Sequence, residues 1–222
     1  MQDDGDCSLE CVFGKESSTF LNISLISFWH QRITCTPTCC FGLPSDPSQP
    51  ETMRRLGYLL LVISVLATAG QLIYYWPRLP DVIASHFDAS GIANGWVSRQ
   101  VFFLIHIGIQ AAMATLLLGL ARYSYKLPDA MFSMPHKDYW LHPSRRATTL
   151  RTNADLLILI SGITAIFLAA LFQIICQINA AGESELPMQF FIPLFIGYVV
   201  AVLAIALFAS SKFAKIPPEP EL

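Results

Sequence analysis

Two histidines and one aspartate stand out in this 222-residue chain because their types and spacing could support chemistry. His86 and Asp88 are two residues apart, and an extended segment would place both side chains on one side. An imidazole and a carboxylate together can do acid–base work or bind a metal ion. A third ligand, such as His106, would have to come from a separate element. We therefore predict no metal and no cofactor, and we keep a membrane enzyme that uses His86 and Asp88 as an alternative function.

A second group of polar residues lies inside otherwise apolar stretches. Gln71, His106 and Gln173 each lie five residues from one end of such a stretch, and Gln177 lies closer still. Helices would place all four on the order of 2–8 Å below the same surface. Polar groups in lipid need partners, so we expect them to face the interior of a helix bundle. They either hold the helices together or line an outward polar pocket that binds a peptide, a lipid headgroup or an ion.

The elements that must position these residues are four stretches without Asp, Glu, Lys or Arg. They contain 21, 21, 23 and 22 residues, and about 20 helical residues cross a membrane. The chain is 54% hydrophobic and only 14% charged, whereas soluble domains have about 25% charged residues. We predict an all-α integral membrane protein, a four-helix transmembrane bundle with a structured outer loop after the first helix. The stretches are Leu56–Trp76, Val101–Ala121, Leu156–Ile178 and Phe190–Ser211.

Lys and Arg are unevenly distributed around these spans. Ten lie near the spans on the side of the termini and the second loop, and two lie on the other side. Because basic residues stay in the cytoplasm, we predict a multi-pass protein of the bacterial inner (plasma) membrane with both termini cytoplasmic. The basic loop 122–155 would be cytoplasmic, and the loops Pro77–Gln100 and Asn179–Gln189 would face outward. The residues expected at anionic headgroups, as simple anchors or as a lipid or partner site, are Arg145, Arg146 and Arg151.

Residues 1–52 differ from the rest of the chain. They hold five of the six cysteines, with spacings that fit neither a zinc site nor a disulfide framework in the cytoplasm. Met53 and two arginines then precede an apolar run, which resembles the start of a bacterial membrane protein. We predict that residues 1–52 are a disordered or spurious extension. Residues 53–69 also resemble a cleavable signal peptide, but the apolar run continues to Trp76, which favours a retained helix.

The loop after the first span has a distinctive sequence, L-P-D-V-I-A-S-H-F-D-A-S-G-I-A-N-G-W, from Leu79 to Trp96. Asp88 and Gly91 have the spacing of a capped turn, and Asn94-Gly95 predicts a second tight turn. The loop resembles a bacterial domain of unknown function, numbered 1648, with the pattern L-P-x-x-I-x-x-H-F-x-x-x-G-x-x-x-G-W. This domain occurs in the amino-terminal part of SdpI-type immunity proteins.

A second stretch, Met134–Leu150, is similar to the N-x-x-Y-W-x-x-P-E-R-R-x-x-T-L segment of small relatives. Its Pro143 suits the first turn of a helix, which predicts one long helix from Pro143 through Ile178. The resemblance implies a first helix and its outer loop over 53–100. Three more transmembrane helices would follow over 101–211, and a cytoplasmic tail over 212–222.

The sequence favours a binding, sensing or immunity-like role over catalysis. It contains no dinucleotide-binding, Walker, nucleophile-elbow or zinc-protease motif, and its net charge of −2 provides no basic field for nucleic acid. The expected partners are membrane lipids and a peptide or toxin ligand recognised by loop 77–100. A small transporter subunit, with Gln110 on its path, is a further alternative. The predicted ligand-binding residues are His86, Asp88, Gly91, Trp96, Gln71, His106, Gln173 and Gln177.

Overall fold

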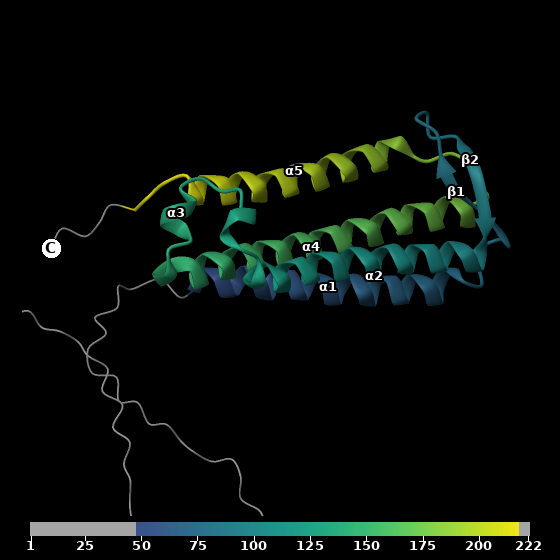
Figure 1. Ribbon diagram of the computed structural model, residues 1–222. Helices are drawn as coiled ribbons and strands as arrows, with labels where there is room; N and C mark the ends of the chain where they lie inside the picture. Colours follow the sequence, from purple (N-terminus) through teal and green to yellow (C-terminus); the bar gives the residue numbers. More distant parts are fainter. Residues whose placement is uncertain (1–47, 218–222) are drawn as a thin grey trace, which may run out of the picture. The chain divides into compact units, whose positions relative to one another are not determined.

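The computed structural model describes residues 48–217, and four long helices dominate this part of the chain (Figure 1). Each helix is long and apolar enough to cross a membrane, which confirms the predicted all-α membrane bundle. The predictions for residues 1–47, and for the end of the tail, lie outside the described residues. The helices are α1 (Ser48–Tyr75), α2 (Arg99–Tyr123), α4 (Pro143–Ala180) and α5 (Met188–Phe213).

Two helix boundaries bear on the predictions. α1 begins at Ser48, so residues 48–52 belong to the first helix and not to a separate extension. Glu51 lies in its first turn and pairs with Arg55 at 2.8 Å, an i,i+4 contact that supports a helix start. α4 begins with Pro143 in its first turn and continues for 38 residues to Ala180. The expectation of one long helix from Pro143 is confirmed.

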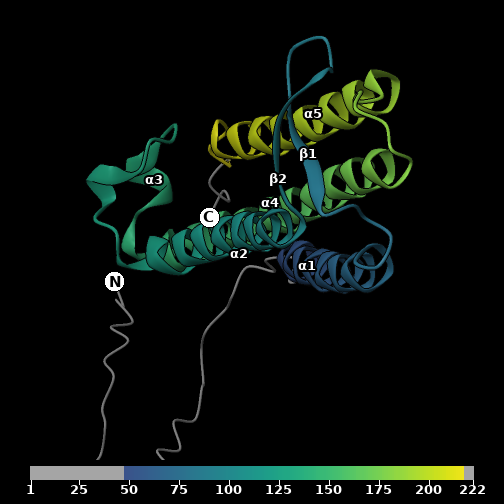
Figure 2. The ribbon, with the colours of Figure 1, turned by 90° about the vertical axis from the view of Figure 1, so that its right-hand side faces the viewer.

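α4 is the central helix of the described part. α1 and α2 both pack against it, and α5 lies on the opposite side of α4 from α1 (Figure 2). α5 contacts α4 through Tyr198, whose ring stacks on Phe167 at 4.4 Å and whose hydroxyl lies 3.2 Å from that of Thr164. α5 has the highest mean hydropathy of the four helices, 2.7, and no residue in its apolar window is buried. A helix that is apolar all round and exposed is suited to contact with lipid.

Two glycines allow the backbones of α1 and α4 to touch. A Cβ atom on Gly57 would lie 2.7 Å from the carbonyl oxygen of Ile158, and one on Gly162 would lie 2.5 Å from the carbonyl oxygen of Gly57. Both distances are too short for a carbon atom. Small residues at helix contacts in membranes permit this close approach, and packing then stabilises the pair.

A buried glutamine joins three helices near the middle of the bundle. The Gln110 amide on α2 donates to the Ser64 hydroxyl at 2.6 Å and accepts from the Thr68 hydroxyl at 3.0 Å, both on α1. The same amide nitrogen lies 3.5 Å from the carbonyl oxygen of Ala165 on α4. All three side chains are buried. This junction, which we call the Gln110 cluster, satisfies the polar groups that the spans carry at this depth.

Between α1 and α2 the chain forms a hairpin of β1 (Val82–Phe87) and β2 (Ala93–Ser98). The strands pair antiparallel, and His86 lies opposite Gly95. The prediction of a second turn at Asn94-Gly95 is therefore wrong, because both residues lie inside β2. Close packing explains the glycine at position 95 instead, because a Cβ atom there would lie 3.0 Å from the Cβ of His86. We call this end of the bundle the hairpin end.

The glycine contact between α1 and α4 leads to a first prediction. Gly57→Ala and Gly162→Ala should each destabilise the protein by about 1–3 kcal/mol, because an added methyl group overpacks the contact. Gly108→Ala is the matched control: it lies in a helix with nothing within 4 Å of its Cβ position, so the substitution should be neutral or stabilise by up to about 1 kcal/mol. Unfolding by SDS in mixed micelles measures the three values. Equal effects at the three positions would contradict the contact.

Candidate functional site

Asn179, near the end of α4, holds the hairpin on the helices. Its side-chain oxygen accepts from the Ala84 backbone N–H at 2.8 Å, and its amide donates to the Ala84 carbonyl at 3.0 Å and to the Ile175 carbonyl at 2.9 Å. Asn179 is only 6% exposed. A side-chain amide can satisfy a backbone N–H and C=O together, as a neighbouring strand would. Asn179 therefore docks β1 onto the bundle.

The base of the hairpin is held by Arg99. Its guanidinium donates to the carbonyl oxygens of Trp76 (3.0 Å) and Leu79 (2.8 Å) and pairs with Asp81 at 3.1 Å. Ile83 on β1 is fully buried in a cluster with aromatic residues of α2 and α4. These contacts fix both the position and the tilt of the hairpin over the helix ends.

The tip of the hairpin is the turn predicted from Asp88 and Gly91. The Asp88 carboxylate accepts from the Ser90 hydroxyl (2.6 Å) and from the backbone N–H groups of Ser90 and Ile92. The Ser90 hydroxyl and the Ile92 N–H together lower the pKa of Asp88 below its ordinary value, because they stabilise the charged form. Gly91 has φ +88° and its carbonyl accepts from Leu186 N at 2.7 Å. The turn is therefore hydrogen-bonded to the loop between α4 and α5.

His86 and His106 line one pocket directly beneath the hairpin. The pocket holds about 190 Å³ between α2 and α4, and the rest of its lining is almost entirely apolar. His106 stacks on Phe172 with ring centroids 3.8 Å apart. Its Nε2 atom is buried and has no hydrogen-bond partner among the residues that the structure describes. We call this the histidine pocket. Its apolar lining includes Phe102, Ile105, Ile109, Leu168 and Leu171.

The three predicted glutamines lie in a different pocket, between α1 and α4. Gln71, Gln173 and Gln177 line a shallow depression of about 410 Å³ with Tyr75. Gln71 donates to the Ala169 carbonyl at 3.1 Å, and Gln173 donates to the Tyr75 hydroxyl at 2.6 Å. These contacts hold helices together, which is the first of the two roles expected for them. The single polar pocket of the sequence prediction is therefore divided into two.

The remaining predicted ligand-binding residues are distributed around the hairpin. Trp96 is 55% exposed on β2, whereas Gly91 is buried at the tip. The Asp88 carboxylate is occupied by its own turn and does not line the histidine pocket. Within residues 48–217, no three His, Cys, Asp or Glu side chains lie close enough to hold a metal ion. His86 and Asp88, the pair named for the enzyme alternative, do not line one pocket.

Three arginines expected at headgroups have protein partners at the opposite end. Arg146 donates to the Asp129 carboxylate (2.9 Å) and to the Leu127 carbonyl (3.0 Å), and so ties down the loop before α4. That loop contains η1 (Ser124–Lys126), η2 (Asp129–Met131) and α3 (Lys137–Trp140). The Arg145 guanidinium lies 4.0 Å from the Tyr139 ring centroid, and Arg151 lies 3.7 Å from Glu51. Arg146 has a structural role that charge counting missed.

Asn179 and Asp155 are the important residues that sequence reasoning missed. Asn179 was assigned to the start of a loop, although it belongs to the last turn of α4. Asp155 precedes a predicted span by one residue and is 2% exposed. The signal available in both cases was a polar residue at the edge of an apolar run. The partner of Asn179, the backbone of Ala84, was too distant in sequence to be recognised.

The hairpin between two transmembrane helices defines the class: a multi-pass membrane protein with a small β-hairpin docked on one end of its bundle. Residues 60–109 match the family model described as "Domain of unknown function (DUF1648)". The matched residues cover most of α1, the hairpin and the first part of α2, and the predicted resemblance to this domain is confirmed. No curated protein and no solved structure matches the chain.

A second prediction concerns the docking of the hairpin. Asn179→Leu keeps the side-chain size but removes both hydrogen bonds to Ala84, and it should cost about 2–4 kcal/mol, since buried backbone groups lose their partners. Hydrogen exchange of the Ala84 amide should accelerate in parallel. Asn94→Leu, an exposed position in β2, is the matched control and should leave Ala84 protected. An unchanged Ala84 amide in Asn179→Leu would contradict the docking role.

Proposed function

We propose that this protein binds a membrane-inserted amphipathic peptide at its hairpin end and acts in sensing or immunity, with no catalytic step. The observation that carries this proposal is the buried, unpartnered Nε2 atom of His106 inside an otherwise apolar pocket. Buried polar atoms in folded proteins almost always have partners. A ligand group that hydrogen-bonds to His106 would supply the missing one.

The size and lining of the histidine pocket support a peptide side chain as the occupant. Its volume of about 190 Å³ is smaller than the roughly 300–1,000 Å³ of pockets that enclose whole small molecules. Its walls are mainly Phe, Ile and Leu side chains, together with the two histidines. A tryptophan side chain suits this lining because it combines a large apolar ring with one N–H donor.

We also propose that the hairpin end faces away from the cytoplasm, in the inner membrane of a bacterium. The opposite end carries most of the described basic residues, among them Arg54, Arg55, Arg122 and the arginines near the start of α4. The hairpin end carries Arg78 and Arg99, and Arg99 is neutralised by Asp81. Basic residues are retained on the cytoplasmic side during insertion, and a peptide arriving from outside would meet the hairpin first.

Cysteine labelling tests this orientation. In a background with the five N-terminal cysteines replaced by serine, Asn94→Cys should react with a membrane-impermeant maleimide in intact cells. Lys212→Cys, in the last turn of α5 at the opposite end, should react only after the membrane is permeabilised. The native Cys176 is fully buried and should stay unlabelled in both. The reverse labelling pattern would place the hairpin in the cytoplasm and overturn the orientation.

Binding is tested with a synthetic Leu/Lys amphipathic helix that carries one tryptophan, added to the protein in nanodiscs. His106→Phe keeps the stacking on Phe172 but removes Nε2, and it should weaken binding about 3–10-fold, the value of one neutral hydrogen bond. The same peptide with phenylalanine in place of tryptophan should bind wild type and variant equally. His142→Phe, an exposed histidine at the opposite end, is the control. Equal affinity of wild type and His106→Phe for the tryptophan peptide would refute the proposal.

A further inference from the structure

The end of the bundle opposite the hairpin carries a pocket with different chemistry. It holds about 330 Å³ and is lined by α1, α2, α4 and the residues just after α2. Its charged residues are Arg54 on α1, Arg122 on α2 and Asp155 on α4, with Tyr58 and Tyr125 beside them. It lies apart from the histidine pocket, and the peptide binding proposed above does not use it.

Asp155 is the unusual member of this pocket. Its side chain is only 2% exposed, and its Oδ2 atom accepts no hydrogen bond from any described residue. The positive charges of Arg54 and Arg151 act on it, but neither guanidinium donates a hydrogen bond to this oxygen. A buried carboxylate is strongly disfavoured unless donors surround it. The free oxygen indicates a site for a donor that comes from outside the chain.

The two arginines give the pocket a second, opposite preference. Arg122 has neither a hydrogen bond nor an ion pair with another residue in the part of the chain that the structure describes, and Arg54 has one long contact, 4.0 Å, with Glu51. Guanidinium groups bind phosphate well because their N–H donors match its oxygens. The pocket therefore offers donors for an anion beside an acceptor for a cation.

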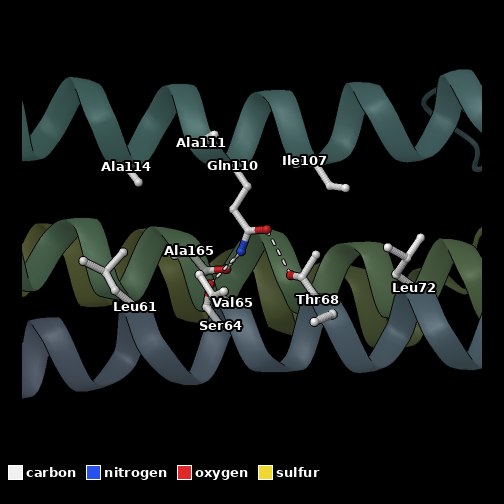
Figure 3. Close-up of a pocket in the computed structure, with 11 residues that line it drawn as sticks. Leu61, Ser64, Val65, Thr68, Leu72, Ile107, Gln110, Ala111, Ala114 and Ala165 are labelled. Carbon is white, nitrogen blue, oxygen red and sulfur yellow. Dashed lines mark hydrogen bonds between the residues drawn. The ribbon is translucent and has the colours of Figure 1, made fainter.

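An apolar groove lies between α1 and α2 (Figure 3), and its nearest residues are about one helical turn from this pocket. Tyr58 and Leu118 line the pocket, and Leu61 and Ala114, about one helical turn further, line the groove. The groove holds about 290 Å³, and Ala165 of α4 forms part of its floor. From Leu61 to Leu72 the groove follows α1 for roughly 17 Å. One leaflet of a bilayer core is only about 15 Å thick, so the groove is long enough for an acyl chain.

We propose that this groove and pocket bind one phospholipid whose headgroup carries a primary ammonium group, as in phosphatidylethanolamine. Arg54 and Arg122 bind the phosphate, the ammonium donates to the Oδ2 atom of Asp155, and one acyl chain lies along the groove. A purely anionic headgroup would leave Asp155 without a partner and would be repelled by it. A quaternary ammonium group has no N–H and could not donate to Asp155.

The wild-type protein itself provides the first test. Native mass spectrometry of the full chain, released from micelles containing dioleoyl phosphatidylethanolamine, should show one retained lipid. Mono- and dimethylation of the headgroup nitrogen should preserve retention, and the third methyl group, which removes the last N–H, should lower it about 10-fold. Equal retention of the trimethylated lipid, or stronger retention of dioleoyl phosphatidylglycerol, would overturn the proposal.

Variants assign the effect to this pocket. Asp155→Asn removes the negative charge but leaves one acceptor oxygen, so it should reduce the preference for the primary amine over the trimethylated lipid. Arg122→Gln should instead weaken retention of both lipids to a similar degree. Ala114→Trp should block the groove and reduce retention of both. Asp138→Asn, an exposed aspartate at the same end, is the matched control for Asp155→Asn and should behave as wild type. A preserved preference in folded Asp155→Asn would refute the assignment. Should Asp155→Asn fail to fold, the methylation series on the wild type still decides the proposal.

Discussion

The backbone contact between α1 and α4 is the interaction on which the other described contacts depend. Gly57 and Gly162 leave no side-chain atoms between the two helices, and in lipid such packing has to replace the hydrophobic effect as the source of helix association. The close packing of α1 on α4 also places Ser64 and Thr68 where Gln110 of α2 forms a hydrogen bond with each of them. The polar cluster then specifies the rotation of α2, because a rotated Gln110 would lose its partners in an apolar medium.

The hairpin depends on the same central helix. α4 extends far enough for Asn179 to form hydrogen bonds with the backbone of β1. Earlier in the same helix, Phe172 packs against the aromatic residues of α2 and stacks on the ring of His106. A hairpin of two strands has little stability of its own. The contacts of this hairpin with Asn179, with Arg99 and with the loop before α5 provide the additional stability that two strands alone do not have. The histidine pocket depends on this docking, because residues of the hairpin line it together with residues of α2 and α4.

The sequence was sufficient for features that depend on length, composition or local spacing. The four spans, the long helix from Pro143 and the turn at Asp88 and Gly91 follow from such patterns. It was insufficient for features that depend on the rotation of helices about their axes. Gln71 and His106 were expected at similar depth, but depth does not say which side of α4 each helix occupies, so one expected pocket became two. Arg146, Asn179 and Asp155 have roles that depend on partners in other elements, and no single-sequence spacing reveals such partners.

The same arrangement explains why two different pockets coexist in one small bundle. α1 and α2 are both packed on α4, and α5 lies on the other side of α4 from α1 and leaves the seam between α1 and α2 open (Figures 1 and 2). An apolar groove therefore lies open along part of that seam. At one end of the helices the chain provides aromatic and aliphatic walls with two imidazole side chains. At the other end it provides two guanidinium groups and a buried carboxylate. A lipid that enters the seam can be bound by its headgroup only where those charges lie, so the open seam and the charged pocket act as one surface, separate from the pocket beneath the hairpin.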